Sequence, residues 1–396
     1  MQIETLILGA GAAGMMCAAH AGPGTLVIDH AKAPGEKIRI SGGGRCNFTN
    51  LGVVPGCFLS QNPHFAKSAL ARYTQWDFIE LVSRHGIAWH EKTLGQLFCD
   101  GKATQIVDML RHEMTAAGAE LWLRTALVDL SHDGARFTAV LEREGTRRSV
   151  SARNLVLATG GRSIPKMGAS GLACDIARRF GLDLVPQRPG LVPFTFADGR
   201  FATLAGLSLP VRMFNERAGF DEAMLFTHRG LSGPAVLQLS SYWHEGEPVQ
   251  VDLLPGTDLG ALLREARRSR GRRALVSELQ GPLPARLVPL LAQEIDLSGN
   301  IGDLSDLRVD ALVQALKSWE LRPQGTEGYR TAEVTLGGIS TDALSSKSME
   351  AKAVPGLFAI GEAVDVTGWL GGYNFQWAWS SGAACGRHIA QSATSR

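Results

Sequence analysis

Cys46 is the side chain of this sequence whose type and setting most favour direct chemistry. It ends the run Ser41-Gly42-Gly43-Gly44-Arg45-Cys46, in which consecutive glycines bend the backbone. A thiol can act as a general acid that protonates one end of a double bond while a hydride reaches the other. A redox disulfide is disfavoured, because the next cysteine, Cys57, lies eleven residues further on. The alternative is a small buried thiol in a tight turn.

Three basic side chains lie in or beside loop segments where they could meet a ligand. His228 stands in Thr227-His228-Arg229-Gly230 and could contact a substrate or donate a proton, or serve only the local structure. Lys37 and Arg45 flank the glycine run and could balance the charge of a phosphate or an anionic substrate. As surface ions they would do neither. The cysteines have no spacing typical of a metal site, so we predict no metal.

A glycine motif near the N-terminus predicts a dinucleotide site. An apolar strand, 5–8, runs into Gly9-Ala10-Gly11-Ala12-Ala13-Gly14, and a helical stretch and a second strand, 25–28, follow it. The first glycine permits a tight turn, the second lets the backbone approach a pyrophosphate, and the third allows the helix to pack closely on the strand. Asp29, after the second strand, can accept hydrogen bonds from ribose hydroxyls. We assign Gly9, Gly11, Ala13, Gly14 and Asp29 to the dinucleotide, which this motif alone leaves as FAD or NAD.

Two later segments favour FAD. The strand in 355–360 leads into Gly361-Glu362, which resembles the C-terminal signature of two-dinucleotide-binding flavoproteins, with Glu in place of the more usual Asp. The run 368–375 opens an apolar helix whose first N–H groups could face the flavin. A strand at 154–157 ends in Ala158-Thr159-Gly160-Gly161, an element of the same superfamily. We assign to the flavin Thr159, Gly160, Gly361, Glu362, Gly371, Gly372, Tyr373 and Asn374, with Lys37, Ser41, Gly42, Gly43 and Arg45 beside them.

Three long motifs, 35–50, 225–234 and 371–382, resemble the BaiN-like family of bacterial NAD(P)/FAD-dependent oxidoreductases. The resemblance covers essentially the whole chain. Members of the family carry names that include aminoacetone oxidase-like protein and, in one branch, ribosomal RNA dihydrouridine synthase. The resemblance implies an FAD-binding domain built from both termini, a β-rich middle domain, and a small helical domain inserted within the middle domain.

We therefore predict an α/β protein with a Rossmann-like FAD-binding domain of the two-dinucleotide-binding type. This domain takes 1–189 and 336–396, the β-rich domain takes 190–255 and 324–335, and the helical insert takes 256–323. The residue patterns agree with this division, because strand-like runs at 192–196, 209–214 and 249–253 precede helical periodicity at 259–268, 273–279, 285–294 and 309–319. A strand-like run at 330–335 then returns to the FAD-binding domain.

A cluster of arginines falls in the predicted helical insert. Within ten residues it contains Arg264, Arg267, Arg268, Arg270, Arg272 and Arg273, and within that window only Glu265 opposes them. Such a cluster could bind RNA phosphates, or it could be a solvated helix face. The net charge of +2 is too small to favour binding to nucleic acid or to a membrane surface. No apolar run is long enough to span a bilayer. We expect a cytoplasmic protein with reduced thiols, and the oligomeric state is not predicted.

The function that these features predict is that of an FAD-dependent oxidoreductase. In our first hypothesis it transfers hydride from reduced flavin to an electron-poor C=C bond, in a small molecule or in a uracil of ribosomal RNA. The second hypothesis is an amine or aminoketone oxidase that uses oxygen, and the third is a flavin-binding partner protein with little turnover. The chain has no second GxGxxG motif, so NAD(P)H would bind only transiently against the flavin, or another donor would reduce it.

Overall fold

The computed structural model describes residues 1–394 of the 396-residue chain. The chain divides into two compact units. The first consists of residues 1–188 together with the chain from residue 333 onward, and the second is the intervening stretch, 189–332.

The first unit is built on a mostly parallel sheet in the order β7-β2-β1-β10-β9-β8, with β20 also paired to β10. The first half of β10 pairs antiparallel with β9, and its last residues, Leu155–Leu157, pair parallel with β20. Because β1, β2, β10 and β20 run parallel, their carboxyl ends share one edge of the sheet, where α/β folds bind ligands. The strands are β1 (Gln2–Leu8), β2 (Thr25–Ile28), β7 (Glu120–Trp122), β8 (Thr125–His132), β9 (Phe137–Arg143), β10 (Thr146–Leu157) and β20 (Leu357–Ala359).

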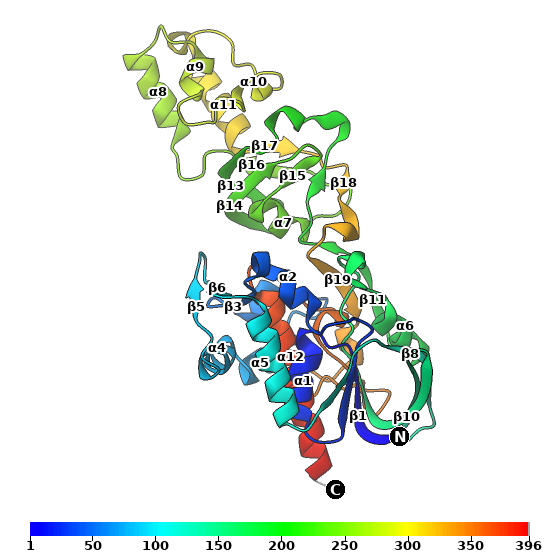
Figure 1. Cartoon of the computed structure of the whole chain (residues 1–396). Helices are drawn as coiled ribbons and strands as arrows, with labels where there is room; N and C mark the ends of the chain where they lie inside the picture. The colour runs from blue at the N-terminus through cyan, green and yellow to red at the C-terminus, as the bar shows by residue number, and fades with distance from the viewer. Residues whose placement is uncertain (395–396) are drawn as a thin grey trace. The chain divides into compact units, whose positions relative to one another are not determined.

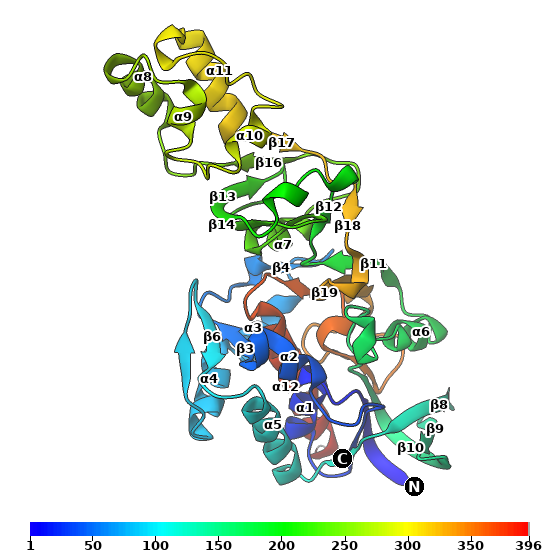
Figure 2. The ribbon, with the colours of Figure 1, turned by 45° about the horizontal axis from the view of Figure 1, so that its top comes forward.

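Helices from both ends of the chain lie side by side against this sheet. Helix α1 packs on α12 and on α5, as Figures 1 and 2 show. The contact with α12 is very close, because a Cβ on Gly382 would lie 2.6 Å from the Ala13 carbonyl oxygen. The helices of this unit are α1 (Ala12–Ala21), α2 (Glu36–Gly44), α3 (Ala66–Arg72), α4 (Gln75–Arg84), α5 (Thr104–Ala116), α6 (Leu172–Arg179) and α12 (Tyr373–Thr394).

Small sheets join segments that are far apart in the sequence. β4 (Phe58–Leu59) pairs with β21 (Thr367–Gly368), which brings the chain after the glycine run to the approach of α12. β11 (Leu184–Gly190) pairs with β19 (Val334–Ile339), and these two strands carry the chain out of the first unit and back into it. The sheet β3-β6-β5 contains β3 (Asn47–Asn50), β5 (Trp89–Glu91) and β6 (Gln96–Cys99).

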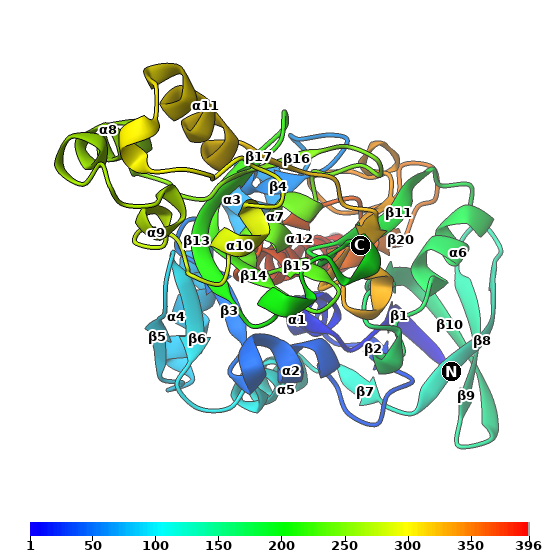
Figure 3. The same ribbon diagram turned by 90° about the horizontal axis from the view of Figure 1, so that it is seen from above.

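The second unit contains an antiparallel sheet in the order β17-β16-β13-β14-β15-β12-β18. Helix α7 (Pro234–Ser240) packs on β13 and β14, and the helices α8 to α11, grouped together in Figure 3, lie between β16 and β17 in the sequence. The strands are β12 (Phe194–Thr195), β13 (Ser208–Phe214), β14 (Gly219–Phe226), β15 (Gly230–Ser232), β16 (Val249–Asp252), β17 (Trp319–Leu321) and β18 (Gly325–Thr326). The helices are α8 (Leu259–Ser269), α9 (Leu275–Leu279), α10 (Val288–Leu291) and α11 (Asp306–Lys317).

Three elements differ most from the sequence prediction. Of the helical run expected at 285–294, only Val288–Leu291 (α10) is α-helix. The strand expected at 330–335 is wrong over its first half, because Gly328, with φ +73°, starts a 3₁₀ turn (Gly328–Arg330) and β19 begins only at Val334. Helix α7 was not predicted at all. Its start, Gly233-Pro234, places proline at the first helical position, where its missing N–H costs nothing. Among the described residues, no helix is long and apolar enough to cross a membrane.

Candidate active site

In the glycine loop after β1, two glycines are packed against the backbone and a third faces open space. Gly9 has φ +109°, and a Cβ there would lie 2.5 Å from the Ala158 carbonyl oxygen. A Cβ on Gly14 would overlap the Gly9 carbonyl oxygen. Gly11 is different, because a Cβ there would meet no described atom within 4 Å. The geometry thus separates two glycines needed for packing from one that faces an open space, where a pyrophosphate could lie.

Asp29, at the end of β2, fixes this loop. Its Oδ2 accepts a hydrogen bond from Ala10 N at 2.7 Å, and its Oδ1 accepts one from Ala31 N at 2.9 Å. A carboxylate offers about four lone-pair sites, so these two bonds leave acceptor capacity for ribose hydroxyls. The predicted ribose contact at Asp29 is therefore compatible with its observed role in holding the loop.

The loop after β10 contains a buried hydroxyl without a partner. Thr159 Oγ1 has no hydrogen-bond partner among the described residues although the atom is buried. Buried polar groups are normally hydrogen-bonded, so an orphaned one often marks the place of a missing ligand or water. Thr159 follows Ala158, whose carbonyl oxygen faces Gly9. The orphaned hydroxyl therefore lies beside the glycine loop, as a residue that contacts a cofactor would.

Glu362 forms an ion pair with Lys37 across 325 positions of the sequence. Lys37 Nζ donates to Glu362 Oε2 at 2.7 Å and to Ser163 Oγ at 2.6 Å. The other carboxylate oxygen, Oε1, accepts hydrogen bonds from Thr335 N at 2.8 Å and Ser163 Oγ at 3.1 Å. Sequence reasoning missed Ser163 and Thr335, because neither lies in a recognisable motif. Their roles become visible only when β19 and the loop after β10 meet.

The start of α12 is held by β3 and by its own loop. A Cβ on Gly372 would overlap the carbonyl oxygen of Thr49, and Asn50 Nδ2 donates to the Gly371 carbonyl at 2.9 Å. Asn374 accepts from Gly368 N at 2.8 Å and donates back to the Gly368 carbonyl at 2.9 Å. The side-chain amide of Asn374 is thus hydrogen-bonded to the protein backbone. The groups of α12 that could face a flavin are therefore its first backbone N–H groups.

Tyr373 and the Gly361 turn complete this region. The Tyr373 ring is buried and makes edge contacts with Phe58 and Trp369. Trp377 and the Ser381 hydroxyl of α12 bond the carbonyl and the N–H of Gly361, each at 3.0 Å. The same helix therefore positions the turn that carries Glu362. Ala13 also lies here, since a Cβ on Gly361 would come within 2.8 Å of the Ala13 methyl group.

The run Ser41–Cys46 forms a left-handed bend at the end of α2. Gly42, Gly43 and Gly44 have φ values of +57°, +66° and +86°, and Cys46, which is not a glycine, has φ +52°. The bend is tied down by Ala103 N, which donates to the Gly44 carbonyl at 2.7 Å. The Arg45 side chain is exposed, and it has no ion pair among the described residues. It is therefore free to meet an anionic ligand.

The Cys46 thiol is fully buried. Its exposed fraction is zero, and burial raises the pKa of the thiol well above its ordinary value. The six cysteines are all buried and none is in a disulfide. A catalytic acid must touch the reacting atoms, and this thiol has no open face. The placement favours the structural alternative for Cys46, and the catalytic assignment stays a prediction.

Cys46→Ala tests that choice. We expect the variant to retain FAD and to keep turnover within about threefold of the wild type, since a buried thiol that touches no substrate contributes nothing to proton transfer. FAD content and the steady-state rate are the measurements. A loss of about a hundredfold in rate with full FAD content would instead restore Cys46 as the proton donor.

His228 lies in the second unit, at the tip between β14 and β15. Its side chain is exposed, and so is that of Arg229. The turn is held by Thr227, whose hydroxyl accepts hydrogen bonds from Arg229 N at 3.3 Å and from Gly230 N at 3.1 Å. No ion pair involves His228 among the described residues. The turn thus presents an exposed imidazole and an exposed guanidinium that form no ion pair within residues 1–394.

Folding brings carboxylates to the arginine cluster that its sequence window does not contain. Most of the cluster is thereby neutralised, and Arg272 is left without an ion pair within residues 1–394. Arg268 pairs only with the exposed Glu265, a contact that is worth little. The remaining pairs are Arg264 with Asp306 and Asp310, Arg267 with Asp306, and Arg270 and Arg273 with Glu278.

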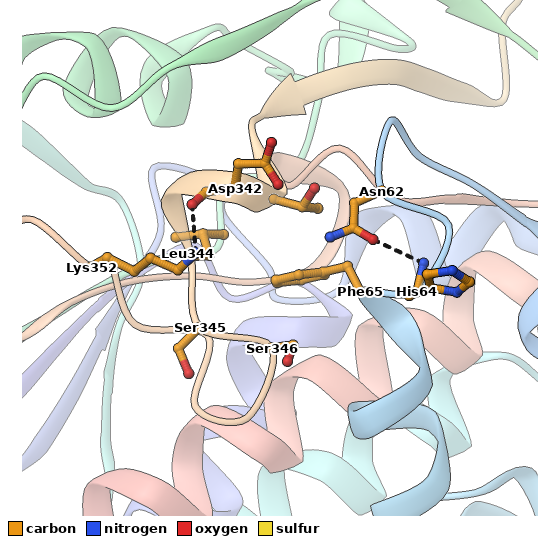
Figure 4. A pocket seen from close by; sticks show the side chains of 9 residues that line it. Asn62, His64, Phe65, Asp342, Leu344, Ser345, Ser346 and Lys352 are labelled. Carbon is orange, nitrogen blue, oxygen red and sulfur yellow. Dashed lines mark hydrogen bonds between the residues drawn. The ribbon is translucent and has the colours of Figure 1, made fainter.

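A polar pocket in the first unit is separate from the predicted site residues (Figure 4). None of its lining residues belongs to the glycine loop, the Ser41–Asn47 run or the α12 start. Lys352, which lines it, already donates to the Asp342 carbonyl at 2.8 Å. The pocket is lined by Asn62, His64, Phe65, Thr341, Asp342, Leu344, Ser345, Ser346 and Lys352.

The described residues contain no cluster of His, Cys, Asp and Glu that could hold a metal ion.

The chain is similar in sequence to known proteins over almost its whole length. The model of the HI0933-like protein Rossmann domain matches residues 3–388. The ribosomal RNA dihydrouridine synthase of Escherichia coli (strain K12) is 53% identical over 400 residues, which cover 98% of each chain. A protein of the same name from Haemophilus influenzae is 49% identical, again over 98% of each chain. The 3-dehydro-bile acid delta(4,6)-reductase of Clostridium scindens is 27% identical over 97% of this chain and 98% of its own.

Solved structures show the same fold at low sequence identity. The 3-ketosteroid-delta4-(5alpha)-dehydrogenase from Rhodococcus jostii RHA1 matches with a TM-score of 0.53 and 16% identity, over 98% of this chain and 97% of its own. The E. coli quinol fumarate reductase subunit FrdA matches with a TM-score of 0.51 and 16% identity, over 100% of this chain and 71% of its own. The predicted Rossmann-type flavoprotein fold is confirmed.

Proposed function

This chain belongs to the HI0933-like family, and on that basis we propose that it is an FAD-dependent reductase that converts uracil in ribosomal RNA to dihydrouridine. The observation that carries the proposal is the match, at 53% and 49% identity and over nearly full length, to two proteins named ribosomal RNA dihydrouridine synthase. The more distant relative is named a reductase. Reduction of an electron-poor C=C bond is the chemistry that these names share.

The residues at the sheet edge fit FAD. The open space beside Gly11 suits the pyrophosphate, and Asp29 keeps lone pairs for the ribose. The orphaned hydroxyl of Thr159 and the first N–H groups of α12 supply donors for the flavin half. FAD, once bound and reduced, supplies a hydride. We further propose NAD(P)H as a transient reductant, since the chain has no second glycine motif to hold it.

Saturation of the uracil C5=C6 bond needs a proton as well as a hydride. The two electrons travel with the hydride to one ring carbon, and the proton goes to the other. We propose that His228 donates this proton, because its imidazole is exposed and carries no ion pair among the described residues. The exposed guanidinium of Arg229 beside it would bind an RNA phosphate.

The arginine cluster has a smaller part in RNA binding than its composition indicates. We propose that only Arg268 and Arg272 contribute, because the other members are held by carboxylates of the same unit. The double variant Arg268→Ala/Arg272→Ala should weaken RNA binding and lower the salt dependence of the affinity by about one unit per arginine. Titration of RNA at several salt concentrations measures this. Arg322→Ala, outside the cluster, is the control, and an unchanged salt slope in the double variant would remove the cluster from the RNA site.

Deletion of the gene in its own host tests the proposal as a whole. Ribosomal RNA from the deletion strain should lack a dihydrouridine that the parent contains, and a plasmid copy of the wild-type gene should restore it. A copy encoding Gly11→Val should not restore it. Unchanged dihydrouridine content, together with peroxide formation from amines by the purified protein, would contradict the proposal and favour an amine oxidase.

A further inference from the structure

We propose that the ion pair of Lys37 and Glu362 is a charge-neutral lock that positions the FAD-binding loops, and that Glu362 does not itself bind the cofactor. The proposal rests on the FAD-binding part of the proposed function. It differs from the expectation for a Gly-acid pair after this strand, in which the acid would meet the ribityl chain. In this role Lys37 and Glu362 are positioning residues.

The contacts of Glu362 leave it little capacity for a ligand. Oε2 accepts from the Lys37 ammonium, and Oε1 accepts from both Thr335 N and Ser163 Oγ. The Ser163 side chain has no exposed surface. Lys37 Nζ in turn donates to Ser163 Oγ at 2.6 Å as well as to the carboxylate. Both carboxylate oxygens of Glu362 therefore already accept from protein atoms, whereas the Lys37 ammonium, which donates twice here, keeps a third N–H.

The network joins the segments that were assigned to the cofactor. Lys37 belongs to α2, which leads into the Ser41–Cys46 bend, and Glu362 belongs to the turn held by α12. Ser163 follows the loop that carries Thr159. A Cβ on Gly161 would overlap the Thr335 hydroxyl and lie 2.9 Å from Glu362 Oε1, so this glycine is needed for the network to close. One side-chain cluster thus sets the relative positions of α2, the β10 loop and the turn before α12.

The lock also controls charge at the site. Burial by itself would raise the pKa of the Glu362 carboxyl, but the Lys37 ammonium and the hydrogen bonds from Thr335 and Ser163 hold the pKa below its ordinary value. The carboxylate is therefore ionised at neutral pH, and its charge is cancelled by Lys37. Without Lys37 an uncompensated negative charge would remain among the loops assigned to FAD, which is itself an anion.

Other charged groups near Glu362 come from the elements packed against it. Arg162 donates its backbone N–H to Thr335 Oγ1 at 2.8 Å, and its side chain is exposed. Glu333 accepts from Ser163 Oγ through its backbone carbonyl, and its side chain is exposed. Neither side chain bonds Glu362. The pH dependence of FAD binding that we expect when Lys37 is replaced should therefore come from Glu362, and Glu333→Gln is the variant that checks this.

The experiment measures the dissociation constant of FAD from deflavinated full-length protein, by flavin fluorescence, between about pH 8 and about pH 5.5. Lys37→Met should bind FAD about tenfold or more weakly than wild type at the upper pH, where Glu362 is charged. Its binding should recover as the pH falls and Glu362 takes up a proton, whereas wild-type binding stays flat. Glu333→Gln in the Lys37→Met background should leave this recovery unchanged.

Two further variants separate the lock from a merely structural role. Lys37→Met/Glu362→Gln removes both charges, while the amide oxygen that replaces Oε1 can still accept from Thr335 N and Ser163 Oγ and so keep the β10 loop joined to β19. This variant should therefore bind FAD within about threefold of wild type at every pH. Glu362→Gln alone should bind at least as tightly as wild type, whereas a ribityl ligand would lose affinity when replaced. Lys317→Met, which breaks the comparable pair of Lys317 with Asp252 at 2.9 Å in the second unit, is the control and should bind like wild type. Thermal unfolding of each apoprotein checks the fold.

Each alternative result overturns the inference. If Lys37→Met binds like wild type, or binds weakly at all pH values without rescue by the double variant, the pair is not a charge lock. If Glu362→Gln binds FAD about tenfold more weakly while its fold is intact, Glu362 is a cofactor ligand. A wild-type chain that does not bind FAD would overturn the proposed function and this inference together, whereas the preceding results leave the proposed function standing.

Discussion

Gly11→Val should abolish FAD binding while it leaves the protein folded. A Cβ at Gly11 meets no described atom within 4 Å, and its φ and ψ of −82° and −169° suit any L-residue. The apoprotein should therefore unfold at the wild-type temperature. The added side chain would, however, occupy the space that the pyrophosphate needs, and we expect FAD affinity to fall by about a hundredfold or more. Flavin content after purification and FAD titration of the apoprotein measure the effect.

Gly56→Val is the matched control for this variant. Gly56 also faces open space and has no positive φ, but it lies in the turn at 55–57, away from the glycine loop. This variant should both fold and bind FAD. Gly14→Ala should instead destabilise the protein itself, because its Cβ would overlap the Gly9 carbonyl oxygen. If Gly11→Val retains FAD, the site does not lie where the motif places it.

His228→Asn should slow RNA reduction by about a hundredfold and leave FAD content unchanged, because loss of a general acid typically costs about 10²–10⁴ in rate. The residue lies at an exposed turn of the second unit, and its removal leaves no buried group unpaired. The measurement is the single-turnover rate at which reduced enzyme is reoxidised by RNA, compared with the unchanged rate of reduction by NAD(P)H.

His244→Asn supplies the control, since His244 is also an exposed histidine of the second unit. It should retain the wild-type rate. If both histidine variants turn over normally, the proton comes from another group or from water. His228 would then serve only the local structure of its turn.

The fold was predictable because its central motifs are local. The strand expected at 25–28 is β2, and the helix after the glycine loop is α1. Each of these depends on residues adjacent in the sequence, namely apolar runs and glycines with fixed conformational demands. The start of α7 and the 3₁₀ turn at Gly328 were missed, because their turn chemistry was read as part of strand-like surroundings.

The details of the candidate site were less predictable, because they depend on contacts between distant segments. No local pattern indicates that Ser163 and Thr335 meet Glu362, or that Asn50 bonds the carbonyl of Gly371. Cys46 shows the opposite difficulty. Its type and its glycine-rich setting indicated reactivity, whereas the fold buries the thiol completely.

The carboxylates that pair with the arginine cluster could not be predicted from the sequence either. A window of sequence contains only the nearest opposing acid, Glu265, while the fold adds Asp306 and Asp310 from α11 and Glu278 from α9. The net charge of this surface is therefore a property of the tertiary structure and not of the sequence window alone.

On the proposed function, reduced flavin on this protein passes its electrons to a uracil of ribosomal RNA. The most direct test is anaerobic: FAD-loaded protein is reduced with NADPH and mixed with ribosomal RNA from the deletion strain. We predict reoxidation of the flavin and formation of one dihydrouridine per flavin reoxidised, both absent with RNA from the parent strain. A flavin that stays reduced in the presence of the unmodified RNA, with no dihydrouridine formed, would contradict the claim.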